Sequence, residues 1–146
     1  MNNEQNAGPI AFKKLQKDAQ LPRRNREGDA GFDLHAQESC EIWIGGQCTI
    51  STGIACELPK GYVGQIWPRS GMAIKHMINS HAGIIDSNYR GEIMVCLINH
   101  GDKKVEIRKG DRIAQLVVVP YFGEAIEVEE LSDTERGLSG FGSSGT

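Results

Sequence analysis

Residues 83–92 read Gly-Ile-Ile-Asp-Ser-Asn-Tyr-Arg-Gly-Glu, and a second apolar run begins directly after them at residues 95–98. Two short apolar runs with a polar, turn-forming segment between them are typical of a β-hairpin, here with polar side chains at its tip. Asp86 ends the first run. A carboxylate at the end of a buried strand is expected to be partly desolvated, which makes Asp86 a candidate general base. The alternative is that Asp86 only caps its own turn.

Similar short apolar runs, separated by Gly, Pro, Asn and Asp, recur along the whole chain. Only residues 72–76 have a weak helical pattern, so no segment is long enough for the crossover helix of a βαβ unit. The sequence therefore predicts one all-β domain, a sandwich or barrel, with a hairpin turn at Gly45-Gly46. The expected strands cover residues 10–15, 32–36, 40–44, 48–51, 53–58, 62–67, 78–80, 93–99, 105–107, 113–119 and 126–130.

The composition excludes several classes of protein. The 146 residues fit a single domain, and the net charge of -3 argues against stable binding of nucleic acid through phosphate charge. No signal peptide and no apolar run of membrane-spanning length is present in this sequence. The four cysteines form no C-x-x-C pair, and we expect reduced thiols in a cytoplasmic protein. The ends are polar, so we expect disorder over residues 1–8 and a mobile arm over residues 132–146.

Five polar clusters interrupt the expected strands. In the last of them, Gly-Phe-Gly-Ser-Ser-Gly offers backbone N–H groups and hydroxyls that can wrap a phosphate, and Arg136 adds a planar guanidinium. Phe141 has no apolar neighbours there and can stack on a base. A disordered tail is the alternative for this segment. The clusters are residues 29–34, 68–71, 83–92, 110–116, and 136–145.

The polar residues within the other clusters have structural alternatives. Arg69-Ser70 after a strand can bind phosphate or form a plain surface turn. Gln115, in an apolar strand, is either a buried hydrogen-bonding group or a group that faces a site. Asp33 and Asp111 can cap backbone N–H groups, and Arg112 can form a salt bridge.

Taken together and in this order, the five clusters resemble one family, the homotrimeric dUTP pyrophosphatases (dUTPases). The stretches that carry the resemblance are Pro-Arg-Ser-Gly, Gly-Ile-Ile-Asp-x-x-Tyr-Arg-Gly-Glu, Gly-Asp-Arg-Ile-Ala-Gln-Leu and Arg-Gly-x-x-Gly-Phe-Gly-Ser-Ser-Gly. The resemblance implies a distorted jelly-roll β-barrel in a threefold trimer. Each site would be shared between subunits, with the C-terminal arm closing over a neighbouring subunit's site.

The reaction that the resemblance implies is hydrolysis of dUTP to dUMP and pyrophosphate, which limits uracil in DNA and supplies dUMP for dTMP synthesis. Asp86 would activate the water that attacks the α-phosphorus, and Asp33 would support the site. Mg²⁺ would be held mainly by the substrate phosphates and waters, with no direct protein ligand. The implied phosphate-binding residues are Arg69, Ser70, Gly71, Gln115, Arg136, Gly142, Ser143 and Ser144.

The resemblance also implies how the base and the sugar are selected. The backbone around the predicted hairpin would pair with uracil, Tyr89 would lie under the deoxyribose, and Phe141 would stack over the base. Many members carry an asparagine where this chain has Ser80, with Asn79 one residue earlier, so either residue can make that contact. The implied uracil- and deoxyribose-binding residues are Asn79, Ser80, Gly83, Ile84, Ile85, Tyr89, Met94 and Phe141.

Two rival functions share this fold. A dCTP deaminase needs a glutamate on the strand after the predicted hairpin, and counting from Gly91 places Cys96 there, which cannot serve as that acid/base. A phage- or virus-type dUTPase with an added regulatory role would act in the host cytoplasm. No long insertion between the clusters is present to form a docking arm for such a role.

Overall fold

The computed structural model describes residues 8–140, and within them it contains eleven strands and one short helix, which confirms the predicted all-β class. Most expected strands are found within a residue or two of their predicted ends. The elements are β1 (Ala11–Lys14), β2 (Phe32–His35), β3 (Cys40–Ile42), β4 (Gln47–Ser51), β5 (Ile54–Glu57), β6 (Tyr62–Pro68), α1 (Ser70–His76), β7 (Ile78–His81), β8 (Ile84–Ile85), β9 (Met94–Asn99), β10 (Val105–Ile107) and β11 (Arg112–Pro120).

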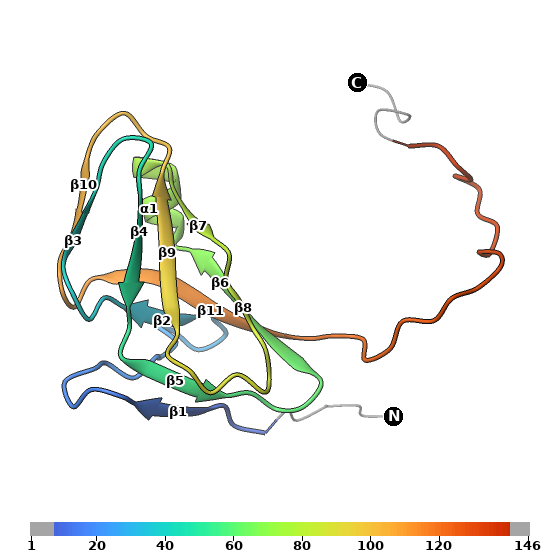
Figure 1. Ribbon diagram of the computed structural model, residues 1–146, viewed down its shortest axis with the longest axis horizontal. Coiled ribbons are helices and arrows are strands. Elements are labelled where there is room, and N and C mark those ends of the chain that lie inside the picture. Colours follow the sequence, from blue (N-terminus) through green and yellow to red (C-terminus); the bar gives the residue numbers. More distant parts are fainter. Residues whose placement is uncertain (1–7, 141–146) are drawn as a thin grey trace.

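All strand pairs are antiparallel, and they form two main sheets and two small ones. The larger sheet has the order β2-β11-β6-β8, and the second has the order β4-β9-β7. The small sheets pair β1 with β5 and β10 with β3. Figure 1 shows β11 running through the body and continuing into the C-terminal segment. The central position of β11 places its residues beside those of β2 and β6.

The core is made of the apolar residues that alternate along these strands. In β9, for example, Val95 and Leu97 are fully buried, whereas Met94 lies at the surface. Burying each such side chain contributes on the order of 2 kcal/mol. The other large side chains with almost no exposure are Leu34, Ile42, Ile50, Ile54, Ile78, Ile93, Ile113 and Leu116.

Two predicted hairpins are absent from the described structure. β8 pairs with β6, with Gly64 opposite Ile85, whereas β9 pairs with β4 and β7 in the other sheet. Residues 86–93 are therefore a loop between sheets and not a hairpin tip. Gly45-Gly46 does form a turn, since the Gly46 N–H donates to the Trp43 carbonyl at 2.8 Å, but β3 and β4 pair with β10 and β9 instead of each other.

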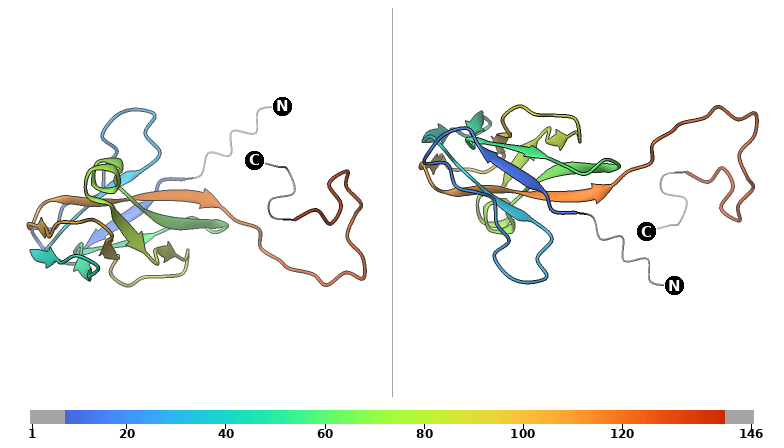
Figure 2. Two further views of the ribbon diagram at one scale, coloured as in Figure 1. Left: turned by 90° about the horizontal axis from the view of Figure 1, so that it is seen from above. Right: turned by 90° about the horizontal axis from the view of Figure 1, so that it is seen from below.

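The predicted strand over residues 126–130 is also wrong. This segment has no strand pairing in the described structure, and Ile126 is 80% exposed. Its alternation of apolar and acidic residues has the period of a strand, but a strand needs a partner for its backbone groups. Residues 121–140 leave the body after β11 (Figure 2). Most of the disorder predicted for residues 1–8, and the end of the predicted arm, lie outside the described residues.

The only helix between residues 8 and 140 is α1, which has seven residues and ends at Met77 in the left-handed region (φ 52°). It confirms the short helical pattern seen in the sequence. No helix of this described region is long and apolar enough to cross a membrane.

Candidate functional site

The sheet topology brings three of the five polar clusters together at one hollow of about 280 Å³. In the four-stranded sheet Gln115 of β11 lies opposite Asp33 of β2 on one side and Trp67 of β6 on the other. The chain leaves β6 at Pro68, passes through Arg69 and enters α1 at Ser70, and these last two residues add their side chains to the hollow. The hollow is lined by Asn25, Asp29, Ala30, Gly31, Asp33, Arg69, Ser70, Gln115 and Val117.

Asp33 organises the charge of this hollow. Its carboxylate oxygens lie 3.4 Å from Arg69 Nε and 3.4 Å from Arg112 Nη1, and its side chain is only 17% exposed. Among the described residues no backbone N–H donates to the Asp33 carboxylate, so the capping alternative finds no support, and Arg112 does form the expected salt bridge. The Asp33 carboxylate, held between two guanidinium groups, restricts the orientation of Arg69, and Asp29 adds a second carboxylate to the lining of the hollow.

Gln115 resolves the other choice that the sequence left open. Its side-chain amide Nε2 donates to the Pro68 carbonyl at 3.2 Å, and the residue also lines the hollow. Gly31 packs so closely against Gln115 that an added Cβ would overlap its side-chain oxygen. The hydrogen bond and this close packing fix the amide group in place. Gly71, by contrast, has open space around it and does not line the hollow.

Asp111, the other carboxylate beside a turn, is structural. Its Oδ2 accepts a hydrogen bond from the backbone N–H of Arg108 at 2.8 Å. This contact confirms the capping alternative for Asp111.

The 86–93 loop presents Asp86 differently from the prediction. Asp86 is exposed, and the partial desolvation expected of it is wrong for the single chain, because β8 is only two residues long and ends at the surface. The Tyr89 N–H donates to the Asp86 carbonyl at 3.0 Å, which closes a turn. Within residues 8–140 the Asp86 carboxylate itself accepts no hydrogen bond, so the capping alternative also finds no support there.

Other residues of this loop hold its shape. The Tyr89 hydroxyl donates to the Glu92 carbonyl at 2.8 Å, and the ring lies so close to Gly91 that an added Cβ would overlap it. Arg90 Nη1 donates to the Ser87 carbonyl at 2.7 Å. The Glu92 carboxylate accepts hydrogen bonds from the Gly53 N–H at 2.7 Å and from a serine hydroxyl of β4. Arg90 and Glu92, to which no role was assigned from the sequence, therefore hold the backbone of the loop in place.

The strand β7 separates the two candidates for the base contact. The Ser80 hydroxyl donates to the Ile66 carbonyl of β6 at 3.2 Å, whereas Asn79 is exposed. The Oδ1 of Asn79 accepts only the N–H of Ser80, at 2.9 Å, among the described contacts. Ser80 is therefore part of the junction with β6, and Asn79 presents its amide group to the surface.

The apolar residues predicted to contact uracil or the sugar fall into two groups. Ile84, Tyr89 and Met94 are 63%, 41% and 38% exposed. Ile85 is buried in the core, so only its backbone can reach a ligand. Gly83 has φ +119°, and an added Cβ would lie 2.9 Å from Ile66 Cβ, so both its conformation and its packing require glycine.

The described chain does not assemble all the predicted residues into one site. None of residues 79–94 lines the hollow formed with Arg69, Ser70 and Gln115. Arg136 lies on the extended segment, where its Nε donates to the Ser139 carbonyl at 2.9 Å. Four other predicted ligands, Phe141, Gly142, Ser143 and Ser144, lie outside the described residues. Between residues 8 and 140 no three His, Cys, Asp or Glu side chains are grouped so that they could hold a metal ion.

Sequence reasoning missed several residues of the hollow. Asp29 and Ala30 belong to a cluster that the sequence singled out, but Asn25 and Val117 gave no signal. Asn25 lies in a loop whose path depends on the turn in which the Arg26 N–H donates to Asp29 Oδ2 at 2.9 Å. Such a path cannot be predicted from residue types alone.

Comparisons with known proteins agree on one family. A family model described as dUTPase matches residues 17–145. The deoxyuridine 5'-triphosphate nucleotidohydrolase of Nautilia profundicola is 52% identical over 139 residues, which cover 93% of this chain and 98% of that protein. The corresponding protein of Candida albicans is 46% identical over 128 residues, covering 86% of this chain and 80% of its own.

Solved structures support the same likeness in three dimensions. The dUTPase of Staphylococcus bacteriophage 80alpha with dUpNHpp has a TM-score of 0.88 at 33% identity, covering 94% of this chain and 99% of that chain. A variant dUTPase of phage phi11 of S. aureus, described with a structural Mg(II) ion, has a TM-score of 0.77 at 28% identity, covering 84% of this chain and 98% of that one. These likenesses confirm the predicted jelly-roll fold.

Proposed function

This chain belongs to the dUTPase family, and on that premise we propose that it hydrolyses dUTP to dUMP and pyrophosphate at sites shared between three copies of the chain. The observation that carries the proposal is the separation of two half-sites in one chain. The hollow lined by Asp33, Arg69, Ser70 and Gln115, called the phosphate hollow below, and the 86–93 loop each have a defined structure. No residue of the loop lines the hollow. A trimer would let the loop of one chain meet the hollow of another.

The hollow would hold the phosphates. Arg69 offers a guanidinium that matches phosphate oxygens, and Asp33, at 3.4 Å, holds it in place. Ser70 contributes a hydroxyl at the same wall, and Gln115 an amide. Gly71, at the surface beside them, would let a phosphate approach its backbone N–H because nothing else occupies that space. A site of this kind neutralises charge that develops on the phosphates during water attack.

Asp86 would act as the general base. A base must lie within hydrogen-bond reach of the water it deprotonates, and an exposed carboxylate with no protein partner among the described residues is free to bind water. Closure of a neighbouring chain over the loop would exclude bulk water from the surroundings of this carboxylate. The water would then attack the α-phosphorus in line, and pyrophosphate would leave.

Selection of uracil and deoxyribose would come from the loop and from β7. The backbone from residue 80 to residue 94 would pair with the base, and Asn79 or Ser80 would add a side-chain contact. The Tyr89 ring, held by its hydroxyl contact to Glu92 at 2.8 Å, would lie under the sugar and exclude a 2′-hydroxyl. Ile84 and Met94 supply exposed apolar surface beside it.

The C-terminal segment would complete the site of a neighbouring chain. Arg136, Gly142, Ser143 and Ser144 would bind phosphates, and Phe141 would stack on uracil. Residues 121–140 project from the body (Figure 1), which suits a segment that is lent to another copy.

Mg²⁺ would be held by the substrate phosphates and waters. The residues of the hollow fit this arrangement, because Arg69, Ser70 and the amides of Asn25 and Gln115 can bind phosphates. Its two carboxylates already have partners, since Asp33 is paired to two arginines and Asp29 accepts the Arg26 N–H. When bound, the ion would neutralise charge on the phosphates.

In the cell, the reaction would limit uracil incorporation into DNA and supply dUMP for dTMP synthesis. We place it in the cytoplasm, of the host if the chain is virus- or phage-encoded. The four cysteines are free thiols, which suits a reducing compartment. Deamination of dCTP is disfavoured, since Cys96 of β9 occupies the position where a glutamate would be needed.

A nucleotide panel tests the proposal. The protein is incubated with Mg²⁺ and dUTP, dCTP, dTTP or UTP, and pyrophosphate and nucleoside monophosphate are quantified. We expect rapid release of dUMP and pyrophosphate from dUTP alone. Comparable rates on dTTP or UTP would contradict the proposed selection, and a monomer in sedimentation that retains full activity would contradict the shared site.

A further inference from the structure

A second hollow, of about 450 Å³, adjoins the phosphate hollow, and the two hollows share Asn25 and Asp33 in their walls. Four of its wall residues are cations from three different parts of the fold. The hollow is lined by Lys14, Gln20, Leu21, Arg23, Arg24, Asn25, Asp33, His35 and Arg112. We call it the basic hollow.

The charge in the basic hollow is largely uncompensated. Its single carboxylate, Asp33, is shared between Arg112 in the basic hollow and Arg69 in the phosphate hollow. Within residues 8–140, Lys14, Arg23 and Arg24 form no salt bridge. The whole chain carries a net charge of -3, so this concentration of positive charge is a local feature and not a consequence of composition.

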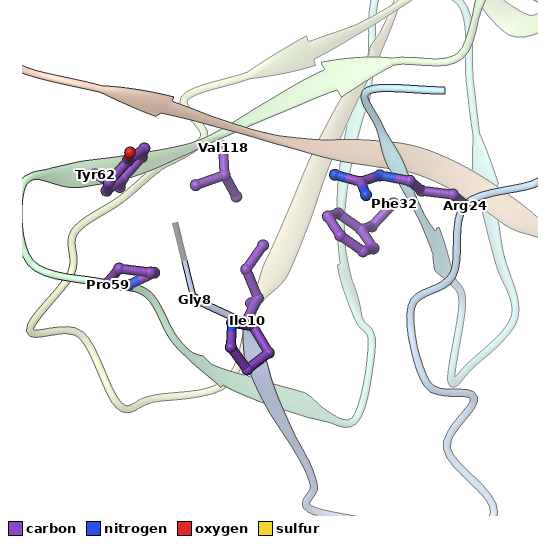
Figure 3. A pocket seen from close by; sticks show the side chains of 8 residues that line it. Gly8, Ile10, Arg24, Phe32, Pro59, Tyr62 and Val118 are labelled. Atoms are coloured by element: carbon purple, nitrogen blue, oxygen red, sulfur yellow. The ribbon is translucent and has the colours of Figure 1, made fainter. Parts of the chain in front are cut away.

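Two of the four cations, Arg24 and Arg112, have contacts that orient their side chains. The Arg24 guanidinium carbon lies 4.4 Å from the centre of the Phe32 ring, and Figure 3 shows the two side chains together. The Arg23 backbone is tied to β2, since its carbonyl accepts the Asp33 N–H at 2.9 Å. Arg112 is oriented by Asp33. Preorganised cations bind an anion at a lower entropic cost than mobile surface side chains do.

A buried polar group, the imidazole of His35, also indicates that the basic hollow binds a ligand. His35 lines the basic hollow, and its Nδ1 is buried without a hydrogen-bond partner among the described residues. An orphaned buried nitrogen is uncommon in a folded protein and indicates a missing partner. A neutral imidazole can donate Nδ1–H to an oxygen of a bound anion.

We propose that the basic hollow is a second anion site, which binds an oligophosphate beside the phosphate hollow. The chemical class follows from the planar guanidinium groups of Arg23, Arg24 and Arg112, which match phosphate oxygens bidentately. The specific ligand, the product pyrophosphate, rests on the proposed function: it is released next to Asp33, the residue that both hollows share. The basic hollow would hold pyrophosphate after the pyrophosphate leaves the phosphate hollow.

Calorimetry on the full-length protein tests this site. The phosphate hollow is first saturated with a dUTP analogue whose α,β-bridge is an imido group, and the binding of this analogue is recorded. Pyrophosphate is then titrated, so that any remaining binding reports the basic hollow. The double variant Arg23→Ser/Arg24→Ser is compared with Arg26→Ser, a matched control in the same loop whose side chain does not line the basic hollow.

We expect pyrophosphate to bind the saturated wild type and the Arg26→Ser control, and the double variant to lose at least 10-fold in affinity. His35→Leu should weaken binding several-fold, and His35→Asn, which keeps a donor near the Nδ1 position, should restore it. No binding to the saturated wild type would overturn the proposal, as would equal binding by the double variant or by sulfate at the same ionic strength.

The acidic segment of another copy is a competing occupant, since Glu127 and Glu129 lie on the exposed C-terminal segment. If pyrophosphate binds the saturated protein only after Glu127→Gln/Glu129→Gln, the hollow is a protein contact and the proposal is wrong. Failure of the analogue to bind would instead count against the proposed function, so the two failures are distinguishable.

Discussion

The phosphate hollow and the 86–93 loop are built in opposite ways. In the hollow, Asp33, Arg69 and Gln115 come from three separate parts of the chain and contact one another inside a single protomer. In the loop, Asp86 and Tyr89 are neighbours in sequence, the backbone is fixed by local hydrogen bonds, and both side chains remain exposed.

The difference shows which part of the site a single chain can complete. Antiparallel pairing of β11 with β2 and β6 is enough to bring the proposed phosphate ligands together. The loop connects two sheets and stands at the surface, so on the proposed function its carboxylate would acquire a reactive environment from another chain. We therefore expect changes in the loop to affect turnover, and changes in the hollow to affect both stability and substrate binding.

The largest effect is expected at Asp86. Asp86→Asn removes the base but keeps the size and exposure of the side chain, so kcat should fall 10²–10⁴-fold with little change in KM. Steady-state kinetics on dUTP with Mg²⁺ measures this. Because Asp86 makes no described side-chain hydrogen bond, Tm should be unchanged. A rate close to that of the wild type would show that Asp86 has no role in the chemistry.

The second effect concerns the C-terminal segment. Deleting residues 137–146 removes several proposed phosphate ligands, and we expect KM to rise and kcat to fall on the order of 10²-fold. Sedimentation should still report the proposed trimer, in which the body and not this segment would provide the contacts between copies. Dissociation into monomers would show that the segment holds the assembly together instead of closing the site.

Two glycines at the phosphate side offer a sharper comparison. Gly31→Ala places a Cβ against the Gln115 side chain, so we expect a loss of about 1–3 kcal/mol in the free energy of unfolding as well as weaker dUTP binding. Gly71→Ala meets open space in the chain and should leave stability unchanged. Denaturant unfolding and KM are measured for both variants.

If phosphate approaches Gly71 as proposed, Gly71→Ala raises KM without destabilising the protein. An unchanged KM for this variant would remove Gly71 from the phosphate site. A Gly31→Ala protein as stable as the wild type would mean that Gln115 is free to move.

The smallest effect is a pH dependence of stability from His35. Burial lowers the pKa of His35 below its ordinary value near 6.5, with Arg112 and Arg69 adding to the shift and Asp33 opposing it. Because the unfolded chain binds a proton more readily, stability is lost as pH falls below about 6.5. Tm measured from pH 7.5 to 5 should fall less steeply for His35→Asn than for the wild type. Parallel curves would contradict this.

Much of the fold followed from local patterns. Runs such as residues 105–107 became strands with the predicted bounds, because alternation and flanking turn residues are local properties. The pairing of strands was less predictable. The sequence suggested that neighbours such as β8 and β9 form a hairpin, but β8 found its partner in β6. Residues 126–130 have a strand pattern and no strand, because they pair with no other segment between residues 8 and 140.

The site divides along the same line. Asp86, Arg69 and Gln115 were identified from the sequence, since residue type and spacing carry the family resemblance. The hydrogen bond from Gln115 to Pro68, the position of Asp33 between two arginines and the basic hollow depend on which segments meet. These contacts join residues far apart in the chain, where sequence spacing gives no information.

By itself, then, the sequence determined the all-β class and the family, and it supplied the candidate groups for the reaction, because these depend on residue types in local order. Only the tertiary structure decided that Asp86 is exposed, that Asn79 rather than Ser80 faces the surface, and that residues 83–92 belong to a connection between two sheets. Exposure and pairing depend on the whole set of neighbours that a residue acquires on folding. The phosphate hollow and the 86–93 loop are separate in the chain, and that separation is a property of its three-dimensional arrangement.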